Sequence, residues 1–323
     1  MTIGVIGGGA WGTALAQVAG ESGDVLLWAR EPEVVEAINR SHENSLFLPG
    51  AALSPRIGAT DDLHALAGCD ALLVVTPAQH LRAVLTDLGR QEAPLILCAK
   101  GIEAGTCLLM SEVAAEVQPR APIAVLSGPT FAHEVAARLP TAVTLACADE
   151  GLGRSLAERI ARPFFRPYLS SDVIGAEIGG AVKNVLAIAC GVVEGRGLGQ
   201  NARAALISRG FAEMTRFGLA KAARPETLAG LSGLGDLVLT CSSTSSRNFS
   251  LGKGIGEGRP AAELLADRRS VAEGAFTAPV LQKAARDAGV DMPVVDAVCA
   301  LLAGTAGVDE VVGELLSRPL TVE

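Results

Sequence analysis

The chain has 323 residues, of which 49% are hydrophobic and 19% charged, with a formal net charge of −8 and a pI of about 5.2. This length and apolar content are sufficient for two well-packed domains. The acidic balance argues against a protein that binds nucleic acid or a membrane surface, because such proteins carry basic patches. A small anionic substrate is still allowed, since it needs only a few local cations.

The seven cysteines are scattered singly and form no CxxC pair. This pattern indicates buried free thiols in a reducing compartment, not disulfides or zinc ligands. The N-terminus has no basic region typical of a signal peptide, and no apolar run approaches the roughly 18 residues that a membrane span needs. The four histidines lie in no metal-ligand spacing. We therefore expect a cytoplasmic protein without stable membrane insertion and without a metal site.

Short apolar runs alternate with helix-like segments in the first half of the chain. Strands are predicted over residues 2–7, 24–29, 70–77, 93–100 and 121–128, and helices over 11–22, 31–40, 80–89 and 106–117, with another helix beginning near 130. The strands are apolar on both faces, which predicts a parallel sheet covered by helices. Two late strands, over 141–148 and 164–170, extend this sheet.

The sequence pattern changes after about residue 172, where Ala- and Leu-rich helical stretches replace the strands. Helices are predicted over 174–194, 202–223, 273–287 and 293–303. The sequence thus predicts an α/β fold: a Rossmann-type doubly wound sheet in a dinucleotide-binding domain of residues 1–175, then an all-helical substrate and catalytic domain of residues 176–323. The many small residues of the helical part suit a homodimer.

A glycine-rich turn follows the first predicted strand and opens the first predicted helix. It has the pattern Gly7-x-Gly9-x-x-Gly12, which allows a tight turn and close approach of the backbone to a pyrophosphate at the helix N-terminus. The second strand ends in Arg30, where a NAD-selective site usually has an acidic residue. A guanidinium suits a 2′-phosphate, so NADP(H) is favoured as the cofactor and NAD(H) is the alternative.

Three further strands end in groups that could reach a ligand, because ligands of doubly wound sheets bind outside the carboxyl ends of the strands. The segments are VVTP (74–77), CAKG (98–101) and LSGPTF (126–131). Lys100 could donate to a substrate oxygen, and Gly128 and Thr130 flank a proline at a helix start. An ordinary exposed loop lysine is the competing interpretation of Lys100.

Lysine is rare in this chain, with five among 27 basic residues, yet Lys183 lies inside the apolar segment GGAVKNVLAIA. A lysine there either reaches water at a helix edge or has a chemical role. Downstream, Asp236 lies one helical turn before Thr240, ahead of a hydroxyl-rich loop with Arg247 and Asn248. That loop could cradle a phosphate, or it could be a simple turn, with Asp236 as a helix cap.

Six ordered motifs between residue 7 and about residue 275 together resemble one family. They are GGGAWGTALA, CAKGIE, LSGPTFAHEV, EIGGAVKNVLAIACGVVEG, LSGLGDLVLTCSSTSSRN and VAEG. They resemble the bacterial NAD(P)-dependent glycerol-3-phosphate dehydrogenases. The resemblance implies reversible NAD(P)H-dependent reduction of dihydroxyacetone phosphate to sn-glycerol 3-phosphate, for phospholipid synthesis.

The resemblance also implies residue roles. Lys183 would be the catalytic acid/base, and Thr240 is a more loosely matched site residue. Besides Lys183, the substrate would be bound by Lys100, Gly128, Thr130, Asp236, Ser246, Arg247 and Asn248. The cofactor would be bound by Gly7, Gly9, Ala10, Trp11, Gly12, Arg30, Lys100, Ala132, Arg247, Val271 and Glu273.

Two alternatives stay open at this point. One is another two-domain reductase with a helical C-terminal half, of the 3-hydroxyacid or 6-phosphogluconate dehydrogenase type. The other is a non-catalytic NADPH-binding regulator, against which the lysines and the Asp236 and Arg247 pair argue.

Overall fold

The structure, a computed structural model, describes residues 2–266 and 272–318. It divides into two compact units, of which one comprises Met1–Lys100 and Leu108–Glu177 and the other Gly101–Cys107 and Ile178–Glu323. The division falls within one long helix, α7 (Val173–Gly195). The domain limits expected from the sequence, 1–175 and 176–323, stay a prediction.

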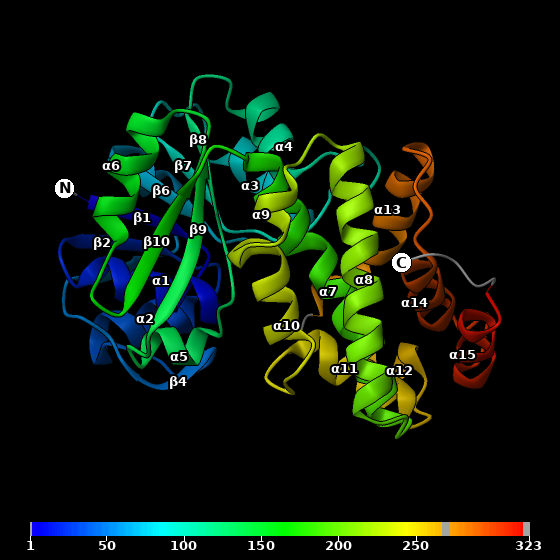
Figure 1. The fold of residues 1–323 in the computed structure, drawn as a ribbon. Helices are drawn as coiled ribbons and strands as arrows, with labels where there is room; N and C mark the ends of the chain where they lie inside the picture. Colours follow the sequence, from blue (N-terminus) through cyan, green and yellow to red (C-terminus); the bar gives the residue numbers. More distant parts are fainter. Residues whose placement is uncertain (1, 267–271, 319–323) are drawn as a thin grey trace. The chain divides into compact units, whose positions relative to one another are not determined.

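An eight-stranded sheet forms the centre of the first unit (Figure 1). Its strand order is β10-β9-β8-β7-β6-β1-β2-β5. The strands are β1 (Thr2–Ile6), β2 (Asp24–Trp28), β5 (Ile57–Thr60), β6 (Ala71–Val74), β7 (Leu95–Leu97), β8 (Ile123–Ser127), β9 (Thr141–Cys147) and β10 (Phe165–Ser170). This confirms the Rossmann-type sheet. The short hairpin β3 (Glu43–Asn44) and β4 (Leu48–Ala52), together with β5, was not predicted.

The sheet is not parallel throughout, in contrast to the expectation from sequence. Strands β5, β2, β1, β6, β7 and β8, in that order across the sheet, run parallel to one another. Strand β9 pairs antiparallel with β8, and β10 is parallel to β9. Only the five-residue helix α5 (Ala132–Ala136) connects β8 to β9. A parallel neighbour needs a longer crossover, usually a helix, and α6 (Glu150–Ile160) supplies one between β9 and β10.

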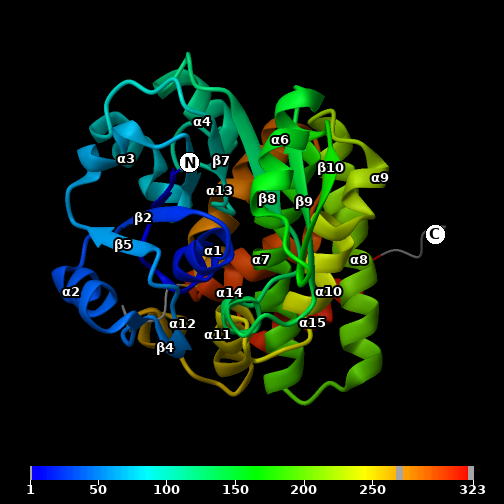
Figure 2. The same cartoon turned by 90° about the vertical axis from the view of Figure 1, so that its left-hand side faces the viewer.

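Helices cover both faces of the sheet and form two buried cores. One face packs against α1 (Ala10–Gly20), α2 (Pro32–Ser41), α5 and α6. The opposite face packs against α3 (Leu81–Asp87) and α4 (Met110–Val117), which lie together in Figure 2.

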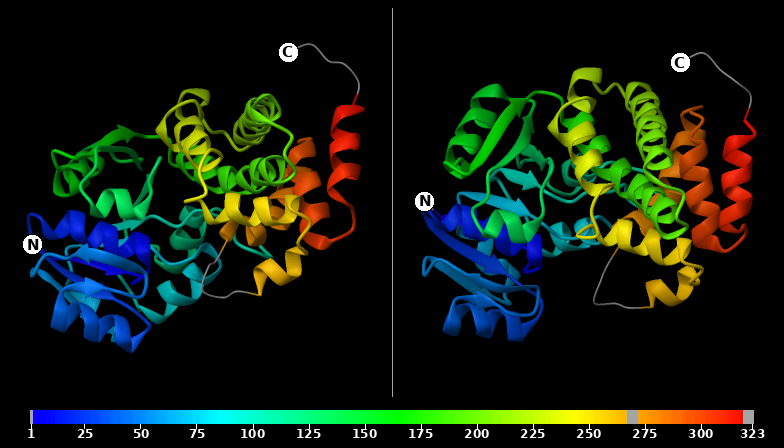
Figure 3. Two further views of the ribbon diagram at one scale, coloured as in Figure 1. Left: turned by 90° about the horizontal axis from the view of Figure 1, so that it is seen from below. Right: turned by 60° about the horizontal axis from the view of Figure 1, so that its bottom comes forward.

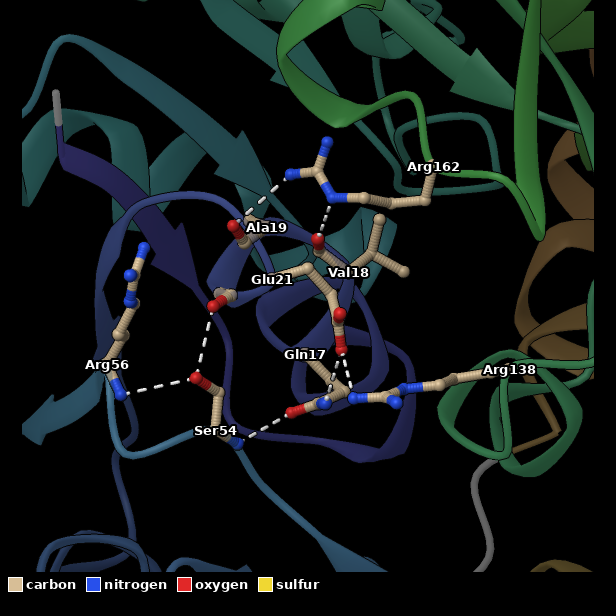
Figure 4. Close-up of polar contacts among 9 residues, drawn as sticks. Gln17, Val18, Ala19, Glu21, Ser54, Arg56, Arg138 and Arg162 are labelled. Atoms are coloured by element: carbon tan, nitrogen blue, oxygen red, sulfur yellow. Dashed lines mark hydrogen bonds and ion pairs between the residues drawn. The ribbon is translucent and has the colours of Figure 1, made fainter.

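The C-terminus of α1 is held by side chains from distant parts of the first unit (Figure 4). Arg162 donates from Nε to the Val18 carbonyl oxygen at 2.9 Å and from Nη2 to that of Ala19 at 3.3 Å. Ser54 Oγ donates to the Gly20 carbonyl oxygen at 3.0 Å. A cation at the negative end of the helix dipole is favourable, so these contacts fix the helix whose other end is the glycine-rich turn.

The second unit is helical in its described residues. In chain order the helices are α7, α8 (Gln200–Ala220), α9 (Pro225–Leu228), α10 (Asp236–Thr240), α11 (Arg247–Gly256), α12 (Ala261–Leu265), α13 (Glu273–Asp287), α14 (Pro293–Ala303) and α15 (Val308–Leu316). A π-helical turn, Leu231–Gly235, precedes α10. The last three helices, drawn in orange and red, lie side by side (Figure 3). The helical second half is thus confirmed.

Helix α7 is long and apolar enough to cross a membrane, by length and composition alone, which corrects the expectation that no segment approaches that length. The sequence did not show it because Lys183 and two glutamates interrupt the apolar run. Most of the helix is buried inside the structure, as is usual for the core helix of a soluble protein.

Two buried carboxylates accept hydrogen bonds from helix N-termini. Glu213 on α8 accepts from the Val294 N–H at 2.8 Å and from the Val295 N–H at 3.3 Å. Glu177 accepts from the Ser111 N–H at 2.7 Å. Burial raises the pKa of each carboxyl to about 7, although the hydrogen bonds act in the opposite direction. Protonation of either carboxyl group therefore stabilises the folded state.

We expect Glu213→Gln to change how stability depends on pH. The folded pKa of about 7 lies above the ordinary glutamate pKa of 4.5, so the stabilisation from protonating Glu213 is complete below pH 4.5 and is lost as the pH rises to about 7. Glutamine stays neutral. The free energy of unfolding of the variant, minus that of wild type, should therefore rise by on the order of 1–2 kcal/mol between pH 5 and 7.5 in denaturant titrations. Glu177 is present in both proteins, so its titration cancels in this difference. Parallel curves of unfolding free energy against pH for the two proteins would contradict the prediction.

Candidate functional site

The glycine-rich turn joins β1 to α1 in the first unit. Gly9 is the N-cap residue of α1, with no side-chain cap and no acidic residue in the first turn. A methyl group on Gly12 would lie 1.9 Å from the Gly7 carbonyl oxygen, so no larger residue fits. The first turn, which contains Ala10 and Trp11, leaves N–H groups without helical acceptors. Such N–H groups are suited to an anion.

Buried polar atoms without partners occur at the carboxyl edge of the same sheet. Within residues 2–266 and 272–318, Thr76 Oγ1 after β6, Ser127 Oγ at the end of β8 and Trp11 Nε1 are buried and have no hydrogen-bond partner. Such atoms are rare in folded proteins unless a water or ligand satisfies them. Thr76 follows β6, which pairs with β1, and Trp11 lies in the glycine-rich turn itself, whereas Ser127 ends β8, three strands from β1. All three are polar groups that a ligand could satisfy.

Three of the substrate residues implied by the resemblance converge after β7 and β8. Lys100 Nζ donates to the Gly128 carbonyl oxygen at 3.1 Å, and Thr130 Oγ1 donates to the same oxygen at 3.3 Å. Lys100 and Thr130 are half-buried, and Ala132 begins helix α5 immediately afterwards. The structure thus brings an ammonium and a hydroxyl to one point at the carboxyl edge.

Arg30 follows β2, as expected from the sequence. Its side chain is 80% exposed and forms an ion pair with Glu31 at 3.1 Å. Glu31 is the N-cap residue of α2. The guanidinium is therefore available to a charged group, but a carboxylate competes for it.

The second unit holds a buried charge pair. Lys183 on α7 donates from Nζ to Asp236 Oδ1 and to Thr240 Oγ1, each at 2.8 Å. The Lys183 side chain is 8% exposed and that of Asp236 is not exposed at all. Asp236 is the first residue of α10, and the N-cap position is occupied by Gly235. This geometry decides against a lysine that reaches water and against Asp236 as a helix cap.

Two buried thiols lie beside this pair. Cys241 follows Thr240 directly, and its thiol contacts that of Cys190, which lies two turns after Lys183 on α7. Burial, followed by the Cys190 contact, raises the pKa of Cys241 well above its usual range, although Lys183 lowers it. The thiol is therefore neutral, and it adds no second negative charge to the Lys183 environment.

A chain of buried amides runs next to Lys183. Asn248 Nδ2 donates to Asn184 Oδ1 at 3.0 Å, and the Gly274 N–H donates to Asn248 Oδ1 at 2.9 Å. Glu273, implied as a cofactor residue, is half-buried and begins α13 next to this contact. Val271, the other such residue of this segment, lies outside the described residues. Asn184, one position after Lys183, was not singled out for a role from the sequence.

The hydroxyl-rich loop ends at the N-terminus of α11. Ser246 is its N-cap residue and accepts from the Phe249 N–H at 3.2 Å, while Arg247 occupies the first helical position with an exposed side chain. A helix N-terminus beside a guanidinium is suited to a phosphate. The described part of the chain contains no group of three or more His, Cys, Asp or Glu that could hold a metal ion.

The comparisons with known proteins identify the family. Two family models match, described as the NAD-dependent glycerol-3-phosphate dehydrogenase N-terminus over residues 2–152 and C-terminus over residues 172–313. The chain belongs to this family. It is 67% identical to glycerol-3-phosphate dehydrogenase [NAD(P)+] of Novosphingobium aromaticivorans, over 99% of this chain and 98% of that protein. It is 61% identical to the enzyme so named in Caulobacter vibrioides, over 99% of this chain and 98% of that protein.

A solved structure agrees with this assignment. The glycerol-3-phosphate dehydrogenase of Coxiella burnetii superposes with a TM-score of 0.93 at 38% identity, covering 98% of this chain and 99% of that one. Membership of the family makes the protein an NAD(P)-dependent oxidoreductase. It also decides against the non-catalytic regulator and the other reductase classes that the sequence alone left open.

The first unit fits a dinucleotide. An uncapped helix N-terminus behind a glycine turn suits a pyrophosphate. The unpartnered atoms of Thr76, Ser127 and Trp11 are polar groups that a ligand could satisfy at that edge.

Proposed function

We propose that the protein reversibly reduces dihydroxyacetone phosphate to sn-glycerol 3-phosphate with NAD(P)H. The observation that carries this proposal is the buried Lys183–Asp236–Thr240 cluster in a chain of this family. The bound nicotinamide supplies or accepts a hydride.

Lys183 is the proposed acid/base. Hydride addition to a ketone leaves an alkoxide, which needs a proton as it forms. A positioned ammonium stabilises that negative charge and donates the proton. Asp236 and Thr240 accept hydrogen bonds from Lys183 Nζ and so orient it. In the reverse direction neutral Lys183 takes the hydroxyl proton.

The remaining site residues are proposed to bind the substrate and the cofactor. Arg247, Asn248 and Ser246 at the α11 N-terminus receive the phosphate. Gly128 and Thr130 are proposed as further substrate-binding residues, by the family resemblance. Lys100 donates to a substrate oxygen and also contacts the cofactor. The dinucleotide lies on the turn Gly7–Gly12, with Arg30 at its adenosine end. Ala132, Val271 and Glu273 are proposed as further cofactor-binding residues, by the family resemblance.

Lys183→Met should lower kcat by about 10³-fold or more, because the variant keeps the side-chain length but has no proton to give. Oxidation of NADPH by dihydroxyacetone phosphate, followed by absorbance, measures this. Binding of NADPH, followed by fluorescence, should persist. The matched control is Lys253→Met, which removes an exposed lysine of the same unit and should keep wild-type kcat. Near-normal turnover by the Lys183 variant would refute the acid/base role, and a wild type inactive with this ketone but active with another would refute the substrate.

Arg247→Ala should raise the KM for dihydroxyacetone phosphate by about 10–100-fold, because the variant loses one charge-assisted hydrogen bond to the phosphate. Initial rates at saturating NADPH measure this. Arg259→Ala removes another exposed arginine of the same unit, paired with Glu263, and should leave KM unchanged. An unaltered KM in the Arg247 variant would remove this residue from the phosphate site.

We further propose that NADP(H) is the favoured cofactor, on the basis of the exposed Arg30 guanidinium at the end of β2. Arg30→Ala should raise the KM for NADPH by about 10-fold or more and change that for NADH by less than about threefold. Measuring both constants for both proteins tests this. Equal changes with the two cofactors would contradict a contact to the 2′-phosphate.

A place in phospholipid synthesis, a cytoplasmic location and a homodimer complete the proposal. The location is supported by the seven cysteines, all of which are free. The homodimer is supported only by the small-residue composition of the helical half.

A further inference from the structure

Asn44 is a fully buried polar residue on the short strand β3, outside every motif of the sequence. Its Nδ2 donates to the Gly8 carbonyl oxygen and to Thr13 Oγ1, each at 2.8 Å. Its Oδ1 accepts from the Phe47 N–H at 3.1 Å. The amide therefore has a partner for each donor hydrogen and for its oxygen, which fixes its orientation.

The Gly8 carbonyl oxygen receives a second donor, Thr13 Oγ1, at 3.3 Å. Thr13 is also fully buried, on the first turns of α1. Asn44 and Thr13 thus hold one carbonyl group in the middle of the glycine-rich turn. Glycine places few restraints on its own backbone. The side chains of Asn44 and Thr13 therefore supply the restraint on the conformation of the turn.

The hydrogen bonds to Gly8 determine where the next N–H points. All described peptide bonds are trans, and in a trans peptide the C=O and the N–H point in opposite directions. With the Gly8 carbonyl held toward Asn44, the Gly9 N–H is directed away from it. Gly8 is buried whereas Gly9 is exposed, so this N–H faces outward at the α1 N-terminus.

We propose that Asn44 is a positioning residue for the cofactor: it fixes the Gly8–Gly9 peptide so that the Gly9 N–H donates to the dinucleotide pyrophosphate. The inference rests on the proposed cofactor site at Gly7–Gly12. Aspartate would set a carboxylate against the Gly8 carbonyl oxygen, and alanine would leave that carbonyl with Thr13 alone. Pairing of β3 with β4, in which Asn44 lies opposite Leu48, holds the amide in place.

The test is binding of each dinucleotide to Asn44→Ala, measured by fluorescence titration with NADH and with NADPH. Because both cofactors share the pyrophosphate, the Kd should rise about 10-fold or more for both, with their ratio unchanged. The kcat at saturating cofactor should stay within about threefold, since Asn44 contacts no reacting atom.

Gln118→Ala is the matched control for loss of a buried amide. Gln118 is 2% exposed, donates to the carbonyl oxygens of Leu85 and Gly89 and accepts from the Gln91 N–H. It lies in the same unit, on the α3 and α4 side of the sheet. It should lower the Tm as Asn44→Ala does while leaving both Kd values within about twofold of wild type.

Thr13→Val provides a milder second variant in case Asn44→Ala does not fold. It keeps the shape of the side chain and removes one of the two donors to Gly8, so the Kd should rise about 2–5-fold.

Unchanged Kd values in Asn44→Ala, or in Thr13→Val if only that variant folds, would overturn the proposal. So would a rise equal to that of Gln118→Ala, because it would indicate general destabilisation. A wild type that bound neither dinucleotide would overturn it together with the cofactor site. A wild type that bound NADPH but did not reduce dihydroxyacetone phosphate would overturn only the proposed substrate.

Discussion

An ammonium group can lie inside the second unit only because a carboxylate lies against it. Removing either charge from water costs several kcal/mol, and leaving one without the other costs about 3–5 kcal/mol. Lys183 and Asp236 meet at 2.8 Å with almost no exposure, and Thr240 accepts a further hydrogen bond. The second unit must therefore hold α10 directly against the middle of α7.

Glycines provide the close approach that the charge pair needs. A methyl group on Gly179 would lie 2.3 Å from the Ser232 carbonyl oxygen, just before α10. One on Gly191 would lie 2.0 Å from the Phe249 carbonyl oxygen, and one on Gly274 2.5 Å from that of Asn184. Backbones thus touch on several sides of α7. With 37 glycines and only 3% aromatic residues, the chain packs by bringing backbones together, not by filling space with large rings.

Features with a local cause could be predicted from the sequence, whereas those set by distant partners could not. The glycine turn, most strands of the sheet and the helical second half each have a periodic or motif signal. Strands β3 to β5 have none, and the reversal of β9 depends on how the chain returns after β8. Lys183 is conspicuous as a lysine in an apolar segment. Its pairing with Asp236, 53 residues later, depends on the tertiary structure and could not be predicted. Asn44 is a single polar residue in an irregular segment and gives no signal at all.

The two units solve the same physical problem. Glycine allows backbone to come close to backbone or ligand, but it loses more conformational freedom on folding than any other residue. The backbone conformation of these glycine-rich segments must then be fixed by buried polar side chains whose own hydrogen bonds set their orientation. In the second unit Asn248 supplies it, linking Asn184 to the Gly274 N–H. In the first unit Asn44 holds Gly8, while Arg162 holds the far end of the same helix. Buried amides and a guanidinium thus hold the glycine-rich backbone in both units, so a residue proposed to contact no reacting atom, such as Asn44, can determine how well a ligand binds.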